Sequence, residues 1–144
     1  MENWQQIGAM SKPLMTKVRA IRGATTADAN TIESMREAVA ELLTEIETRN
    51  QLDYEEIISV IFTVTSDLDA TFPAAIAREN PQWENVPLLD LQQMQVRGSL
   101  EKCIRVLIYF NTDKPQAEIY HPYLRKARNL RPDWNLTHMI MGNK

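Results

Sequence analysis

Apolar side chains recur along residues 31–49 with the spacing of one face of an α-helix. The pattern predicts a helix over this range that packs on a sheet. Asn30 is a natural N-cap because Glu33 follows three residues later, and Asn50 can end the helix. The apolar stripe consists of Ile32, Met35, Val39, Leu42, Leu43 and Ile46.

Runs of apolar and β-branched residues predict the strands, with the third and fourth joined around Gly98. Pro73 opens a short predicted helix over residues 74–78, because proline is tolerated at the first helical position. Residues 123–130 are compatible with a strand or a helix. The order of elements predicts an α+β domain, a mostly antiparallel mixed sheet with one long helix on one face. The expected strands cover residues 17–24, 57–65, 86–96, 102–111 and 117–120.

The length of 144 residues fits a single domain, which we place at residues 17–134. Residues 1–16 are polar and lack the pattern of a signal peptide, so we expect a disordered extension. Residues 135–144 are expected to be a frayed tail.

Two of the expected strands are apolar on both faces, over residues 57–64 and 104–110. One helix can cover only one face of the sheet. The second face is therefore expected to be buried against another subunit, which predicts a closed homo-oligomer.

A net charge of -3 disfavours nucleic acid or an anionic membrane as the main partner. The single cysteine, Cys103, excludes an internal disulfide and suits a reducing, cytoplasmic location. Together with His121 and His138 it does not form the pattern of a metal site. No apolar run approaches the length of a membrane span.

Arg105 lies inside the apolar run of residues 103–110, and its permanent charge requires a partner wherever the strand places it. The run supplies no carboxylate, so either a distant acidic residue pairs with Arg105 or an anionic ligand does. Arg22 shares its expected face with apolar neighbours, and Arg78 and Arg131 could join it. Guanidinium groups bind carboxylates with two hydrogen bonds, so the matching ligand is a small organic dianion.

Asp90 is a carboxylate within an apolar strand, and a salt bridge to Arg105 or Arg22 is its simplest explanation. Gln93 follows nearby, but residues 90 and 93 face opposite sides of a regular strand. They share a site only if a bulge or the strand end intervenes. Tyr123 could offer its phenol to a ligand or could be a core residue with a satisfied hydroxyl.

The sequence contains no glycine-rich phosphate loop and no nucleophile motif. An enzyme built from these residues would need neither a covalent intermediate nor a cofactor. It would act through substrate orientation and electrostatic stabilisation.

Four motifs resemble the AroH class of chorismate mutases, and the similarity extends over residues 17–134. They lie at residues 19–26, 72–75, 98–106 and 123–133. The resemblance implies a homotrimeric pseudo-α/β barrel with active sites between subunits. It also implies the conversion of chorismate to prephenate, a cofactor-free Claisen rearrangement on the branch toward phenylalanine and tyrosine.

The resemblance also implies roles for individual residues. The arginine matching Arg105 faces the ether oxygen of the breaking bond, while those matching Arg22 and Tyr123 contact substrate carboxylates. Leu130 and Arg131 match a mobile C-terminal segment. The remaining expected substrate-binding residues are Phe72, Ala74 and Arg78 from the adjacent subunit, with Leu88 and Leu89 beside Asp90.

The chain departs from the family at two positions of the expected site. Gln93 stands where a glutamate is common, and Asp90 stands where a cysteine is common. Our hypothesis is that Asp90 takes over the contact to the substrate hydroxyl and balances Arg105, while Gln93 keeps a neutral hydrogen bond. The expected catalytic residues are therefore Arg105, Asp90 and Gln93. A further departure, Ala75 in place of a lysine, is expected to weaken a peripheral contact.

Two other functions remain open at this point. The chain could bind a chorismate-like dicarboxylate without catalysis, because the glutamate is missing. It could instead be a trimeric enamine/imine deaminase, a family of similar shape with clefts between subunits. The motifs around Arg22, Arg105 and Tyr123 favour the mutase.

Overall fold

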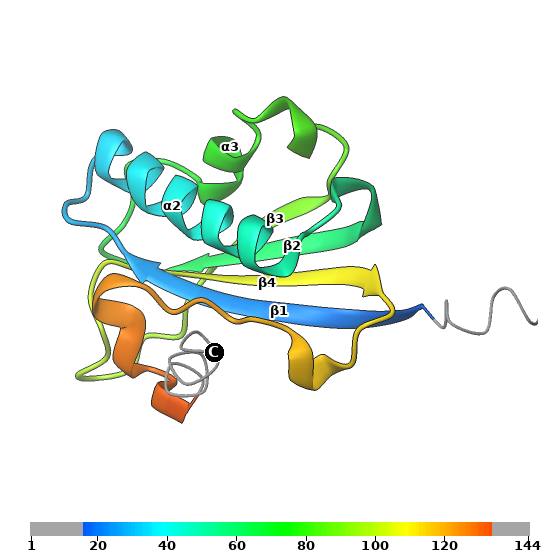
Figure 1. Ribbon diagram of the computed structural model, residues 1–144. Coiled ribbons are helices and arrows are strands. Elements are labelled where there is room, and N and C mark those ends of the chain that lie inside the picture. Colours follow the sequence, from blue (N-terminus) through cyan, green and yellow to red (C-terminus); the bar gives the residue numbers. More distant parts are fainter. Residues whose placement is uncertain (1–15, 134–144) are drawn as a thin grey trace, which may run out of the picture.

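The computed structural model describes residues 16–133, in which one long helix covers one face of a four-stranded sheet (Figure 1). The expectations for the two termini lie outside the described residues, apart from Thr16 at the boundary. The principal elements are β1 (Lys17–Thr26), α2 (Ile32–Asn50), β2 (Ile57–Val64), α3 (Pro73–Ala77), β3 (Leu88–Gln92) and β4 (Cys103–Thr112). Short 3-10 helices include η4 (Gln116–Glu118) and η5 (Arg125–Asn129).

The strand order is β1-β4-β2-β3. β4 is antiparallel to both β1 and β2, whereas β3 is parallel to β2. The mixed, mostly antiparallel α+β sheet is therefore confirmed. The expected strand over 117–120 is wrong, because Pro115 precedes a turn of 3-10 helix in which the Glu118 amide donates to the Pro115 carbonyl at 3.0 Å. Residues 123–130 contain a single bridge, between Tyr123 and Ala24, followed by η5.

The core lies between the sheet and α2. Alternate residues of β4 point into it, as the period of two along a strand requires, and the predicted stripe of α2 is buried from Met35 onward. Ile32 is the exception, with 48% of its surface exposed, because the helix reaches the sheet only after its first turn. The buried β4 residues are Ile104, Val106, Ile108 and Phe110.

The caps of α2 differ from the prediction by one residue at each end. Thr31 is the N-cap, and its hydroxyl accepts from the Ser34 amide at 3.1 Å. The Asn30 carboxamide is instead hydrogen-bonded to Asp69 and the Ala70 amide. At the other end, Gln51 adopts the left-handed conformation with φ of 50°.

Asn50 does not close α2 as a C-cap. It is buried, and its side-chain amide donates to the carbonyl oxygens of Ile46 and Tyr120. Its side-chain oxygen accepts from the Tyr120 amide at 2.8 Å, so Asn50 fixes the segment that leads to Tyr123.

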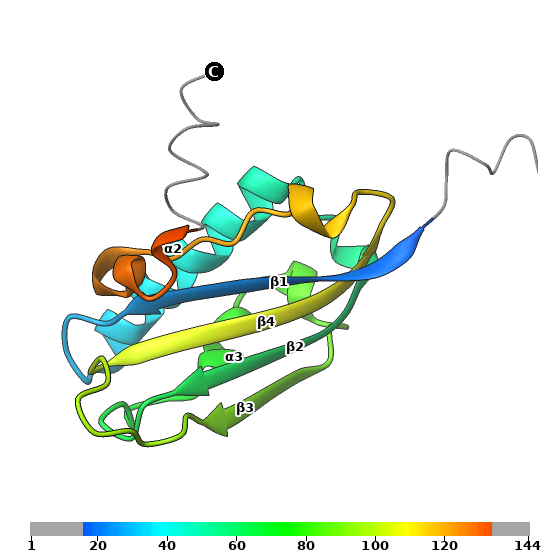
Figure 2. The same cartoon turned by 90° about the horizontal axis from the view of Figure 1, so that it is seen from below.

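The opposite face of the sheet is not covered by α2 or α3 (Figure 2). Leu89 and Leu91 of the edge strand are 55% and 46% exposed on it, and Val18 and Tyr109 are also exposed. We call this surface the open face. Within residues 16–133, no helix is long and apolar enough to cross a membrane.

Candidate active site

Arg105 projects from β4 onto the open face, at the position that pairs with Ala24 of β1 and Thr63 of β2. Its side chain is half-buried, and its Nε donates to Oε1 of Gln93 at 3.1 Å. Among residues 16–133, no carboxylate oxygen lies within 4.0 Å of the guanidinium in an ion pair. Because the Gln93 carboxamide is neutral, it orients the charge of Arg105 without cancelling it.

Cys103 lies two residues before Arg105 on the same face of β4. Burial raises the pKa of its thiol, and the nearby Arg105 charge opposes that rise. The thiol is therefore protonated at neutral pH and acts as a buried packing group.

Tyr123 brings a phenol to the same region. Its bridge to Ala24 adds residue 123 to the sheet beside β1, and the Leu124 amide donates to the Ala24 carbonyl at 2.8 Å. Burial raises the pKa of the Tyr123 phenol, while the positive charges of Arg22, Arg105 and Arg131 lower it. The phenol is thus neutral and able to donate at neutral pH, with three guanidinium groups close enough to act on it.

The arrangement of Tyr123 beside β1 depends on Gly23. A Cβ atom at position 23 would lie 3.0 Å from the Pro122 carbonyl oxygen and 3.2 Å from the Cδ1 atom of Leu42. Glycine therefore allows the backbone of residue 122 to approach the sheet closely.

The structure joins six of the sequence-predicted site residues into one cluster, which we call the cationic group. Leu130 packs against the small buried cluster of Ala24, Tyr123 and Ala127. The Arg131 guanidinium lies 3.0 Å from Asp133, so part of its charge is already paired. The cationic group consists of Arg22, Gln93, Arg105, Tyr123, Leu130 and Arg131.

Within one chain Asp90 does not pair with Arg105, so the salt bridge that was its simplest explanation is wrong for contacts inside a subunit. It is the partner of Phe62 in the β2–β3 register, and Phe62 is buried on the side of α2, whereas Arg105 is on the open face. Asp90 Oδ1 instead accepts from the Ala74 amide at 3.0 Å. Residues 90 and 93 therefore contact opposite sides of the sheet, as the strand period implies.

Asp90 belongs with the residues expected from the adjacent subunit. Burial raises the pKa of its carboxyl, while the Ala74 amide and the positive charge of Arg78 lower it. Phe72, just before α3, is exposed. We call Phe72, Ala74, Arg78 and Asp90 the edge group.

Two of the three leucines of β3, Leu88 and Leu89, occupy different surroundings. Leu88 packs partly against the core, because its partner Val60 is buried on the side of α2. Leu89 is exposed on the open face. Of these two leucines, only Leu89 is therefore accessible to a ligand or a subunit on that face.

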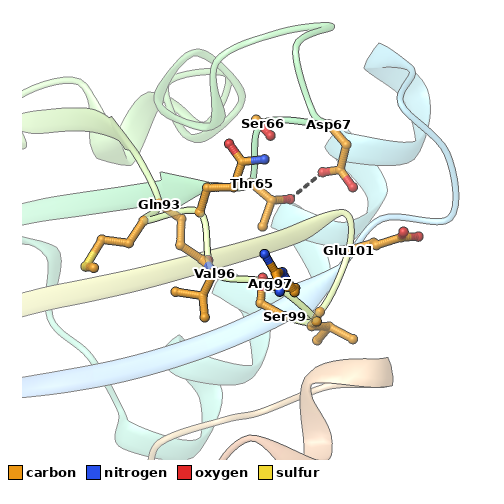
Figure 3. Close-up of a pocket in the computed structure, with 12 residues that line it drawn as sticks. Thr65, Ser66, Asp67, Gln93, Val96, Arg97, Ser99 and Glu101 are labelled. Carbon is orange, nitrogen blue, oxygen red and sulfur yellow. Dashed lines mark hydrogen bonds between the residues drawn. The ribbon is translucent and has the colours of Figure 1, made fainter.

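Two hollows flank these groups in the described part of the chain. One, of about 410 Å³, is lined by Phe72 and Asp90 of the edge group. The other, of about 460 Å³, is lined by Gln93, the loop of residues 94–101 and Thr65–Asp67 (Figure 3). Arg105 lines neither hollow, and residues of the edge group line only the first.

Sequence reasoning missed the support at the start of β4. The Asp67 carboxylate accepts from the Lys102 amide at 2.9 Å and from the Thr65 hydroxyl, a bond visible in Figure 3. The Thr65 hydroxyl accepts in turn from the Cys103 amide at 3.0 Å. These bonds fix the residues immediately before Arg105, and the Thr65-Ser66-Asp67 sequence is the turn signal that could have indicated them.

An α+β fold with arginines and a neutral phenol around one surface suits the binding of a small organic dianion. The described residues contain no group of three or more potential metal ligands. The family model of chorismate mutase type I matches residues 18–134, and the chain belongs to that family.

Characterised relatives agree with this assignment. The chain is 42% identical to chorismate mutase AroH of Bacillus subtilis over 120 residues, which is 83% of this chain and 94% of the relative. It is 48% identical to chorismate mutase AroH of Thermus thermophilus over 117 residues, 81% and 95% of the two chains. A solved chorismate mutase from Clostridium thermocellum superimposes with a TM-score of 0.73 at 49% identity, covering 76% of this chain and 96% of that one.

Proposed function

We propose that the chain binds chorismate between the cationic group of one subunit and the edge group of the next, and that Arg105 is its main catalytic residue. The reaction is that of the family: the chain is a chorismate mutase, an isomerase that converts chorismate to prephenate. The proposal concerns how its residues accomplish this.

The observation that carries the proposal is the incomplete pairing of Arg105. Its Nε is bonded to a neutral carboxamide, and the charge remains available to a ligand. In the rearrangement, negative charge builds on the ether oxygen as the C–O bond breaks. A fixed cation beside that oxygen stabilises the transition state more than the ground state, which is the requirement for catalysis.

The rest of the cationic group suits the substrate carboxylates. Arg22 lies on the face of Arg105, and the neutral Tyr123 phenol can donate a hydrogen bond. Two carboxylates held in this way restrict chorismate to the compact conformation in which its bond-forming atoms approach. Leu130 and Arg131 belong to the same group, and we propose that they close over the bound molecule.

A homotrimer is part of the proposal, because one chain carries the two groups in different places. Asp90 and Ala74 are on the side of α3, whereas Arg105 is on the open face. The exposed leucines of β3 give the open face an apolar surface suited to burial by another copy. A cytoplasmic location is likewise proposed from the single reduced cysteine.

From the contacts within one chain we propose other roles for Gln93 and Asp90 than our hypothesis gave them, and the hypothesis itself, which concerns a site between subunits, stays a prediction. Gln93 positions the Arg105 guanidinium. Asp90 holds the Ala74 amide and attracts Arg78, so it acts on the edge group rather than as the counter-charge of Arg105.

The test is to mix the purified full chain with chorismate and follow the loss of its absorbance as prephenate forms. We expect rapid turnover by the wild type and a loss of about 10²–10³ in kcat for Arg105→Ala. Arg19→Ala is the matched control, because the Arg19 side chain only donates to the Lys114 carbonyl far along β1.

Near wild-type turnover by Arg105→Ala would refute the role of Arg105. Binding of chorismate without any turnover by the wild type would instead favour the non-catalytic binder. No observation favours the deaminase.

A further inference from the structure

The segment that carries Tyr123, Leu130 and Arg131 is joined to the rest of the described chain by a small apolar cluster. Only Ala24, Tyr123 and Ala127 are fully buried in it, with Leu100 and Leu130 partly buried around them. So few apolar contacts leave the position of the segment dependent on polar contacts.

Arg125 makes several of these polar contacts. Its Nε is 3.1 Å from Oε1 of Glu41, and its other nitrogens lie 3.6 Å from Glu37 and 3.7 Å from Asp28. Its Nη1 also donates to the Thr26 carbonyl at 3.2 Å. One side chain of η5 therefore contacts the end of β1, the loop after it and the middle of α2.

The Arg125 side chain is only 19% exposed, whereas its three acidic partners are between 46% and 81% exposed. Each pair alone would contribute little at an exposed site. Here a single guanidinium lies between three carboxylates, and Glu37 and Glu41 lie one turn apart on α2. Removal of Arg125 would leave three like charges facing the segment without a cation between them.

The backbone of Arg125 adds a second observation. Its φ is 52°, a left-handed conformation that a residue with a side chain adopts only when its surroundings favour it. This conformation turns the chain from Leu124 into η5, so that the guanidinium reaches α2 while Tyr123 stays beside β1.

We propose that Arg125 is a positioning residue that ties residues 123–133 to β1 and α2, and so keeps Tyr123, Leu130 and Arg131 in place for the substrate. This inference rests on the proposed substrate contacts of those three residues. Arg125 itself contacts no substrate, since its guanidinium is occupied by Glu41 and the Thr26 carbonyl.

The kinetic test compares Arg125→Gln with Lys126→Gln in the full chain. Lys126 is the next residue of the segment, is exposed and contributes only its backbone amide to Thr26. Lys126→Gln therefore removes one positive charge, as Arg125→Gln does, but leaves the contacts of Arg125 intact. For Arg125→Gln we expect the KM for chorismate to rise by about 2–10-fold, because the competent position of the segment is less populated. The kcat should stay within about twofold, because saturating substrate restores that position.

Four further tests separate the charge of Arg125 from other causes. Arg125→Lys should recover part of the KM, and Arg125→Gly should behave like Arg125→Gln, although glycine relaxes the left-handed backbone. Added salt should raise the KM of the wild type more steeply than that of Arg125→Gln. Hydrogen exchange should become faster over residues 123–133 in Arg125→Gln and stay unchanged in α2.

An unchanged KM, or wild-type behaviour of Arg125→Gly, would overturn the proposal. Unchanged hydrogen exchange in the segment would also overturn it. Because hydrogen exchange needs no turnover, it judges the role of Arg125 even if the wild type proves inactive and the proposed function fails.

Discussion

At the scale of single residues, Arg105 and Asp90 show how the surroundings of a charge determine its use. Arg105 has a neutral hydrogen-bond partner in Gln93, so its charge can act on a ligand. Asp90 has a backbone amide as partner and a guanidinium nearby, so its charge is used within the fold. A charge that remains available beside a site is the one that can stabilise a transition state.

This difference predicts a ranking of two variants. Gln93→Ala removes the bond that orients Arg105 and should lower kcat by about tenfold, as expected for a lost hydrogen bond to a charged group. Asp90→Asn keeps an oxygen that can accept from the Ala74 amide, so kcat should change by less than about twofold. Steady-state kinetics with chorismate provide the measurement. A larger loss for Asp90→Asn would restore our original hypothesis that Asp90 acts in the reaction.

The Asp90→Asn variant should also change how stability depends on pH. Burial raises the pKa of Asp90 above its usual 3.8, so the folded state binds the proton more tightly than the unfolded state. The ionised carboxylate costs no stability at pH values below the pKa of Asp90 in the unfolded state. The cost develops as the pH rises through the pKa of Asp90 in the folded state. Relative to the wild type, the Tm of Asp90→Asn should therefore rise as the pH increases above about 3.8. A difference that stays constant with pH would contradict this account.

At the scale of elements, the close approach of the Tyr123 segment to β1 can be tested at Gly23. In Gly23→Ala the new methyl group would meet the Pro122 carbonyl, Leu42 and Val106 at 3.0–3.3 Å. We expect a loss of about 1–3 kcal/mol in the free energy of unfolding. Urea denaturation provides the measurement. Gly98→Asn is the control: its Cβ would meet nothing within 4 Å, and asparagine tolerates the left-handed φ of 78°. An equal loss in both variants would show that the close approach is not the cause.

Periodicity predicted the elements where it is strong, as in α2 and β4. It could not decide whether Asn30 or Thr31 caps α2, because both side chains can accept the bond. The tertiary contact of Asn30 with Asp69 and Ala70 decides in favour of Thr31. The parallel pairing of β3 with β2 could not be predicted from periodicity either. The strand that follows β3 in the sequence is β4, and the pattern of apolar residues does not say which neighbour β3 pairs with.

The parts of the candidate site that could be predicted are those in which the residue type alone, such as a permanently charged arginine, indicates the chemistry. Arg22 and Arg105 were each expected beside apolar neighbours of their own strand, and the register of β1 with β4 brings both onto the open face. The partner of Asp90 could not be predicted. It depends on the register of β3 with β2, which turns Asp90 toward the Ala74 amide.

At the scale of the whole molecule, the separation of the cationic group from the edge group leads to the strictest prediction. If each site combines Arg105 of one subunit with Arg78 of the next, two inactive variants can complement each other. In mixed trimers of Arg105→Ala and Arg78→Ala, some sites combine the intact Arg105 of one variant with the intact Arg78 of the other. Random mixing in equal amounts should restore about a quarter of the sites, because two independent halves must both be intact.

The experiment co-refolds the two variants, or co-expresses them with different tags, and measures chorismate turnover. Each variant refolded alone should stay inactive. A mixture of the double variant with either single variant should show no more activity than the two proteins measured separately. The fraction of activity should fall as the mixture departs from equal amounts, since intact sites require both kinds of subunit. Activity that never exceeds the sum of the separate variants, in oligomers shown by their tags to be mixed, would mean that Arg105 and Arg78 do not share a site across subunits.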